Sequence, residues 1–106
     1  MMDYTPAIVQ VVPHDDHTVS VYFCDGKIVL YDVNPKLEDG VFRELKDINV
    51  FIDSCKIMND TLAWDVSGNN NPSDCIDIDP DYLYSLDYAE EIIKVSWARY
   101  LWYVEL

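Results

Sequence analysis

The strongest structural signal in the sequence is Val19-Ser-Val-Tyr-Phe-Cys-Asp-Gly-Lys-Ile-Val-Leu-Tyr-Asp32, in which two alternating apolar runs meet at Asp25-Gly26. This pattern is typical of two antiparallel strands joined by a tight turn. If Asp25-Gly26 is a two-residue type I′ loop, each step away from the turn advances both strands by one residue. The expected pairs are then Cys24 with Lys27, Phe23 with Ile28, Val21 with Leu30 and Val19 with Asp32.

This register gives the hairpin two apolar faces. The first face is expected to lie on the core and consists of Val19, Val21, Phe23, Ile28 and Leu30. The second face carries Tyr22, Val29, Tyr31 and Val33. The second face is too apolar to be left wholly in water, so we expect a helix, a second sheet layer or another subunit to cover it.

Composition predicts a folded and strongly acidic chain. The 106 residues are 50% hydrophobic and 13% aromatic, which is too apolar for a disordered chain and enough for one modest core. The 20 acidic residues outnumber the 7 basic ones, which gives a net charge of −13. Such a field repels phosphate backbones and anionic lipid head groups, so we expect no direct binding to nucleic acid or membranes.

The remaining elements predict an α+β fold: a small antiparallel sheet built from two hairpins plus short helices, with a C-terminal helix. Residues 7–12 and 75–79 have strand patterns, and residues 55–58 and 61–64 are expected to form a second hairpin around Asn59-Asp60. The register of this hairpin would place Cys55, Ile57, Leu62 and Trp64 on one face. Residues 67–73 have a loop composition. Residues 40–47 predict a short helix whose inner side carries Val41, Phe42 and Leu45.

Another short helix is expected to begin at Asp79-Pro80, with Asp79 as N-cap and Asp81 in the first turn. In that helix Tyr82, Leu83 and Leu86 would face inward. We assign residues 1–87 to a small α+β domain, and residues 88–106 to an aromatic helical extension that packs on this domain or on a partner subunit. Within the extension, residues 97–103 are apolar on almost every side. The candidate interaction surface comprises Tyr22, Val29, Tyr31, Trp97, Tyr100, Trp102 and Tyr103.

The three cysteines predict a reducing compartment. Their odd number and the absence of a Cys-x-x-Cys spacing fit neither a disulfide framework nor a structural zinc site. Cys24 and Cys55 fall in predicted strands, and Cys75 lies among Asp74, Asp77 and Asp79, whose charges disfavour a thiolate. The amino terminus lacks a signal-peptide pattern, and no stretch is long enough to span a bilayer. We therefore expect a cytoplasmic protein.

Two clusters resemble metal sites but have simpler explanations. His14-Asp15-Asp16-His17 lacks a third committed ligand and is more typical of a turn. Asp77, Asp79 and Asp81 alternate like calcium ligands, yet Tyr82 stands where a calcium loop has glycine and Tyr88 where it has glutamate. The sequence also has no nucleophile-elbow or phosphate-loop signature. We expect no catalytic residue, metal or cofactor.

Five pieces in a fixed order resemble the bacterial family called domain of unknown function 2442, over about residues 8–84. The pieces are the strand-Asp-Gly-strand unit, the Tyr31-Asp-Val-Asn-Pro-Lys-Leu37 exit, Gly40-Val-Phe-Arg-Glu-Leu45, Leu62-Ala-Trp64, and Ile78-Asp-Pro-Asp-Tyr-Leu-Tyr84. The resemblance implies a small α+β domain, in some members beside a helix-turn-helix module or in a toxin–antitoxin-like gene pair. It brings no established activity. This chain departs from the pattern in a longer 66–74 loop, in the aromatic residues after Tyr88 and in lacking a helix-turn-helix motif.

We therefore expect a non-enzymatic protein-interaction module whose partner is a second copy of itself or a basic protein. The alternative is an antitoxin-like protein that neutralises a small basic partner by charge complementarity. A small hydrolase or metal-dependent enzyme is the third and least supported hypothesis.

Overall fold

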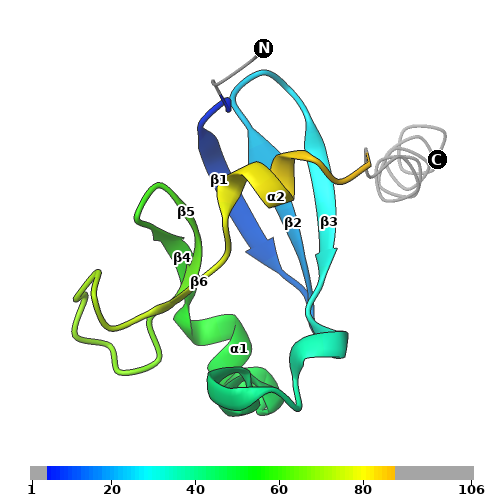
Figure 1. The fold of residues 1–106 in the computed structure, drawn as a ribbon. Coiled ribbons are helices and arrows are strands. Elements are labelled where there is room, and N and C mark those ends of the chain that lie inside the picture. The colour runs from blue at the N-terminus through cyan, green and yellow to red at the C-terminus, as the bar shows by residue number, and fades with distance from the viewer. Residues whose placement is uncertain (1–4, 88–106) are drawn as a thin grey trace, which may run out of the picture.

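The computed structural model describes residues 5–87, which form two antiparallel sheets with short helices between and after them (Figure 1). Each sheet has three strands, in the orders β1-β2-β3 and β4-β5-β6. This architecture confirms the expected α+β class. The elements are β1 (Ile8–Pro13), β2 (Thr18–Phe23), β3 (Ile28–Asp32), the 3₁₀ helices η1 (Asn34–Lys36) and η2 (Gly40–Lys46), α1 (Ile48–Ser54), β4 (Cys55–Met58), β5 (Thr61–Trp64), β6 (Ile76–Asp77) and α2 (Pro80–Tyr84).

The register of the β2-β3 hairpin differs from the expected one by one residue. The observed pairs are Thr18 with Asp32, Val19 with Tyr31, Ser20 with Leu30, Val21 with Val29 and Tyr22 with Ile28. The expected pairs of Cys24 with Lys27, Phe23 with Ile28, Val21 with Leu30 and Val19 with Asp32 are therefore wrong.

The turn explains this shift, because its loop holds three residues, Cys24, Asp25 and Gly26. The Gly26 N–H donates to the Phe23 carbonyl at 3.0 Å, and the Phe23 N–H donates to the Lys27 carbonyl at 2.8 Å. Gly26 has a φ of +98°, whereas Asp25 is not in the positive-φ region that a type I′ turn requires at both central residues. The loop is a type I turn followed by a G1 bulge, which adds one residue to the connection.

The shifted register exchanges the two faces of β3. Because side chains alternate along a strand, a one-residue shift turns each of them to the opposite side. Val29 and Tyr31 are therefore buried, while Ile28 and Leu30 are only half-buried. Val29 and Tyr31 belong to the core and present no surface to a partner, contrary to the expectation, and Tyr22 on the opposite face is half-buried.

The β4-β5 hairpin has the register that the sequence predicts. Asn59 and Asp60 form its two-residue loop, with φ values of +56° and +61°, as a type I′ turn requires. All four residues of β5 are buried, and β6 pairs with its other side. The observed β4-β5 pairs are Cys55 with Trp64, Lys56 with Ala63, Ile57 with Leu62 and Met58 with Thr61.

One hydrophobic core joins the two sheets and the helices. The β2-β3 hairpin and β5 supply most of its side chains, and single residues from η2, α1 and α2 close it. Its buried members are Ile8, Val19, Val21, Phe23, Val29, Tyr31, Val33, Leu45, Phe51, Leu62, Trp64, Ile78 and Leu83.

The segment 40–47, which was expected to be a short helix, forms the 3₁₀ helix η2, and α1 follows it. Leu45 is buried and Phe42 is half-buried, but Val41 is 59% exposed, so its expected inward position is wrong. The 3₁₀ geometry gives the reason, because three residues per turn align positions 42 and 45 and rotate position 41 away from them. Asp47 then caps α1 by accepting from the Asn49 N–H.

The α2 helix begins as expected and lies across one face of the first sheet (Figure 1). Asp79 is the N-cap and accepts from the Asp81 N–H, and Pro80 occupies the first turn. Leu83 is buried, whereas Tyr82 is half exposed and meets Tyr31 only at a ring edge. A helix of five residues turns one narrow side inward, so the expectation that Tyr82 faces the core is wrong.

Two expectations lie outside the described residues. These are the helical extension over residues 88–106 and the positions of Trp97, Tyr100, Trp102 and Tyr103.

Candidate functional site

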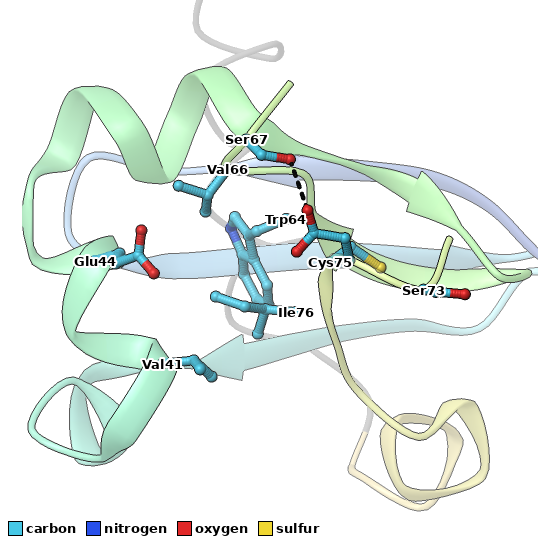
Figure 2. Close-up of a pocket in the computed structure, with 9 residues that line it drawn as sticks. Val41, Glu44, Trp64, Val66, Ser67, Ser73, Cys75 and Ile76 are labelled. Atoms are coloured by element: carbon cyan, nitrogen blue, oxygen red, sulfur yellow. Dashed lines mark hydrogen bonds between the residues drawn. The ribbon is translucent and has the colours of Figure 1, made fainter. Parts of the chain in front are cut away.

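A pocket of about 420 Å³ opens between η2, the end of β5 and the loop that leads to β6 (Figure 2). Its volume is within the ~300–1,000 Å³ that is usual for ligand sites. The lining residues are Val41, Glu44, Trp64, Val66, Ser67, Ser73, Asp74, Cys75 and Ile76.

The inner wall of this pocket is the indole ring of Trp64. Trp64 is the last residue of β5 and is 0% exposed, with Phe51 of α1 packed against its ring at a centroid distance of 5.7 Å. Val66 and Ile76 add apolar surface beside it. The indole Nε1 is buried and has no hydrogen-bond partner among the described residues.

Two carboxylates stand at the pocket. Glu44 projects from η2 toward the edge of the indole that carries Nε1 (Figure 2). Asp74 comes from the opposite loop, where its Oδ2 accepts from Ser67 Oγ at 3.3 Å and from Asn69 Nδ2 at 3.1 Å. The pocket therefore combines an apolar inner wall with negative charge contributed by two separate segments.

Side chains outside the pocket anchor the loop that forms its outer wall. Lys56 Nζ donates to Asn70 Oδ1 at 2.7 Å and forms an ion pair with Asp65 Oδ2 at 3.6 Å. Asp65 Oδ2 also accepts from the Asn70 N–H at 3.0 Å. Asn59, at the tip of the β4-β5 hairpin, donates through Nδ2 to the Pro72 carbonyl at 3.0 Å. The long loop is thus tied to β4 and to the β4-β5 turn.

A smaller cavity of about 280 Å³ lies beside α1, with Val66 lining both cavities. Asp65 lines this cavity with a side chain that is 2% exposed, and its Oδ1 has no hydrogen-bond partner among the described residues. Lys56 already offsets the charge of Asp65. The larger pocket, with its two further carboxylates, is therefore the better candidate site.

Cys75 lines the pocket as a thiol. Burial and the charges of Asp77, Asp65 and Asp74 raise its pKa above the ordinary value of 9.0, so the thiolate is disfavoured as the sequence predicts. Burial also raises the pKa of Cys55 to about 12. Cys24, expected in a strand, instead lies exposed in the β2-β3 turn, because the strand ends at Phe23.

The two histidines of the 14–17 segment have different partners. His14 Nε2 is 2.7 Å from Ser20 Oγ, whereas His17 Nε2 is 2.8 Å from the Leu45 carbonyl. The His17 ring also packs on Phe51 at a centroid distance of 4.8 Å. The His14 contact lies within the β1-β2 hairpin, whereas the His17 contacts join that hairpin to η2 and α1.

The alternating aspartates at 77, 79 and 81 also have separate structural roles. Asp77 Oδ2 accepts from Asn59 Nδ2 at 3.0 Å, Asp79 caps α2, and Asp81 accepts from Thr5 Oγ1. Residues 5–87 contain no group of three or more side chains placed to hold a metal ion.

The sequence pattern of the family described as Protein of unknown function (DUF2442) matches residues 8–89, which is most of the chain. The chain belongs to this family. No curated protein and no solved structure matched it. The DUF2442 match has nearly the range that the five sequence pieces predicted. Within residues 5–87, no helix of the DUF2442 protein is long and apolar enough to cross a membrane.

Sequence reasoning did not find the pocket of this DUF2442 domain. Glu44 and Asp74 are far apart in the sequence, and Trp64 resembles any other buried strand residue. The one available signal was the long 66–74 loop, which supplies most of the outer wall. The candidate surface drawn from the sequence does not coincide with the pocket, because Tyr22, Val29 and Tyr31 are not among its lining residues.

Proposed function

We propose that this DUF2442 protein is a non-enzymatic interaction module that binds a basic protein partner at the pocket between η2 and the 66–74 loop. The observation that carries the proposal is that Glu44 and Asp74 both line a pocket whose inner wall is an indole ring, in a chain of net charge −13. Complementary charge steers association and selects partners of opposite sign.

Four of the five cations among residues 5–87 support this proposal because they are engaged elsewhere. Lys27 donates to the Tyr84 carbonyl, Arg43 donates to the Glu38 carbonyl and Lys46 pairs with the Glu38 carboxylate at 2.7 Å. Lys56 holds the loop beside Asp65. Among residues 5–87 no Lys or Arg lines the pocket, so none of the described cations neutralises its carboxylates.

The apolar surface at the pocket favours a protein partner over a free inorganic cation. Val41, which is 59% exposed, lines the pocket together with Val66 and Ile76. Protein interfaces combine such an apolar centre with a polar rim. The thiol form of Cys75 favours binding over covalent chemistry. An antitoxin-like role is the special case in which the basic partner is a toxin.

The test is affinity capture with the full chain, with the captured protein identified by mass spectrometry and then purified for direct titration. We expect a basic partner that is released as salt is raised, and binding at least about tenfold weaker for Glu44→Gln/Asp74→Asn. The matched control, Asp15→Asn/Asp60→Asn, removes the same charge outside the pocket lining and should change the affinity much less. Equal weakening by both pairs would show that only net charge matters.

A second arm titrates duplex DNA and RNA at physiological salt. We expect no detectable binding, because every phosphate would approach an acidic surface. Specific micromolar binding to either nucleic acid would overturn the proposal.

A further inference from the structure

We infer that the pocket receives an arginine residue of the partner, with the guanidinium bound by the Glu44 and Asp74 carboxylates and an adjacent peptide carbonyl bound by the Trp64 indole N–H. This inference rests on the proposed function and specifies the group that the site recognises. It starts from Trp64, a side chain with 0% exposure whose Nε1 lacks an acceptor among the described residues.

An unpaired indole N–H is an unusual feature of a protein interior. Buried Trp N–H groups usually find a partner, and one left unsatisfied destabilises the fold. Trp64 lines the pocket and turns its nitrogen-bearing edge toward the Glu44 side (Figure 2). Nε1 is itself out of reach of solvent, so a ligand carbonyl becomes its acceptor only when the side chains around this edge of the indole move aside on binding.

The two carboxylates of the pocket call for a second ligand group, a cation that donates hydrogen bonds. Glu44 and Asp74 are acceptors, so a ligand that satisfies the whole site carries a hydrogen-bond acceptor and a cation within one small unit. A basic residue of an extended peptide has both, because its own or its neighbour's carbonyl lies close to the side-chain stem. An inorganic cation supplies no acceptor, and an anion would be repelled by both carboxylates.

Arginine fits this arrangement better than lysine. Its planar guanidinium has five donors and binds carboxylates in a two-pronged manner, whereas lysine presents a compact, strongly hydrated charge. Asp74 is already oriented by Ser67 and Asn69, so its position is defined before a ligand arrives. The apolar stem of arginine can pack against Val66 and Ile76.

The experiment follows the indole N–H of Trp64 by ¹⁵N NMR. Trp97→Phe/Trp102→Phe leaves Trp64 as the sole tryptophan of the full chain. If that double variant does not fold, the two single variants assign the Trp64 signal by elimination in the wild-type spectrum. The probes are acetyl-Gly-Arg-Gly-amide, its lysine counterpart and its glutamine counterpart, which keeps the carbonyls and loses the charge.

We expect the arginine peptide to shift the Trp64 indole proton downfield in a saturable manner, the lysine peptide to bind more weakly, and the glutamine peptide to produce no saturable shift. Glu44→Gln should lower the affinity for the arginine peptide at least about tenfold, while Asp60→Asn should leave this affinity unchanged. The inference is overturned if the peptide leaves the Trp64 signal unmoved, if Glu44→Gln has no effect, or if the free protein already shows a hydrogen-bonded indole.

The experiments can reject the arginine inference without rejecting the proposed function. A basic partner whose capture depends on Glu44 and Asp74, together with no response to the arginine peptide, would reject the arginine inference and leave the proposed function standing. Loss of both responses would reject both.

Discussion

Tyr84 is the residue that ties the tip of the β2-β3 hairpin to α2. Its hydroxyl donates to Asp25 Oδ2 at 2.6 Å, and its backbone carbonyl accepts from Lys27 Nζ at 2.6 Å. The Lys27 ammonium also lies 4.7 Å from the centroid of the Tyr84 ring, and Phe23 meets that ring edge-on at 5.0 Å. The turn and the helix therefore hold each other in place through one residue, Tyr84, by its side chain and its backbone carbonyl.

The Tyr84 contact predicts an acid-sensitive contribution to stability. The hydrogen bond from Tyr84, followed by that from the Lys27 N–H, lowers the pKa of Asp25 below its ordinary value of 3.8. A carboxyl with a lowered folded-state pKa stabilises the fold above its unfolded pKa, and this stabilisation is lost as the pH falls through the folded value. We expect Tyr84→Phe to lower the melting temperature at pH 7, and the difference from wild type to shrink below about pH 4. Thermal unfolding followed by circular dichroism from pH 7 to 2 tests this, and a difference independent of pH would contradict it.

Val29 and Leu30 distinguish the observed register from the alternative one. Val29 is fully buried and Leu30 is half-buried, although leucine has the larger side chain. We expect Val29→Ala to lower the free energy of unfolding by about 2 kcal/mol, and Leu30→Ala to cost about 1 kcal/mol or less. Urea unfolding of both variants measures the difference. A larger loss for Leu30→Ala than for Val29→Ala would instead favour the register that a two-residue loop at Asp25-Gly26 gives.

The two hairpins show which parts of an element can be predicted from sequence. Both were predicted to exist because alternation and turn residues are local signals. The register of β4-β5 was also predicted, whereas that of β2-β3 was not, because Asp25-Gly26 fits both a two-residue loop and a three-residue loop ending at Gly26. Because the loop length was ambiguous by one residue, the prediction placed Val29 and Tyr31 on the wrong face of β3.

The positive φ values in the turns predict opposite effects of adding and removing glycine. At Gly26 an added Cβ would meet nothing within 4 Å, so Gly26→Ala costs only backbone strain, which we expect to be about 1–2 kcal/mol. Asp60 adopts a φ of +61°, so Asp60→Gly relieves a similar strain and should stabilise the protein by about 0.5–1 kcal/mol. Chemical denaturation of both variants tests the pair. A loss of stability in Asp60→Gly would show that this position is unstrained.

The candidate site was harder to predict than the elements that form it. Glu44 belongs to a 3₁₀ helix, Trp64 to a buried strand and Asp74 to a loop, and no local spacing relates them. Their proximity depends on how the second sheet packs beside η2 and α1, which is a property of the tertiary fold. A missing hydrogen-bond partner, such as that of Trp64 Nε1, is visible only once every neighbour has been placed.

The excess of negative charge acts on the whole molecule. With a net charge of −13, mutual repulsion destabilises the compact state and is screened by salt. We expect the melting temperature to rise between low and moderate salt, most clearly above about pH 6, where the carboxylates are ionised. Calorimetry at increasing sodium chloride measures the change. A melting temperature that falls would mean that ion pairs such as Lys46–Glu38 outweigh the net repulsion.

The aromatic residues 97–103 lead to a prediction about assembly. Their sequence is apolar on almost every side of a helix, so we predict a dimer or larger oligomer that loses affinity when Trp102 is replaced by alanine. Light scattering at micromolar concentration measures the mass of both proteins. A wild-type protein of monomeric mass would reject this prediction.

The anchoring of the 66–74 loop by Lys56, Asn59 and Asp65 has a thermodynamic consequence for binding. A wall that is already ordered does not lose conformational entropy when a ligand arrives, so more of the interaction energy remains as affinity. The heat-capacity change on binding should then reflect only the apolar area covered in the pocket. It should be far smaller than in coupled folding and binding, where roughly 1,000–3,000 Å² is buried.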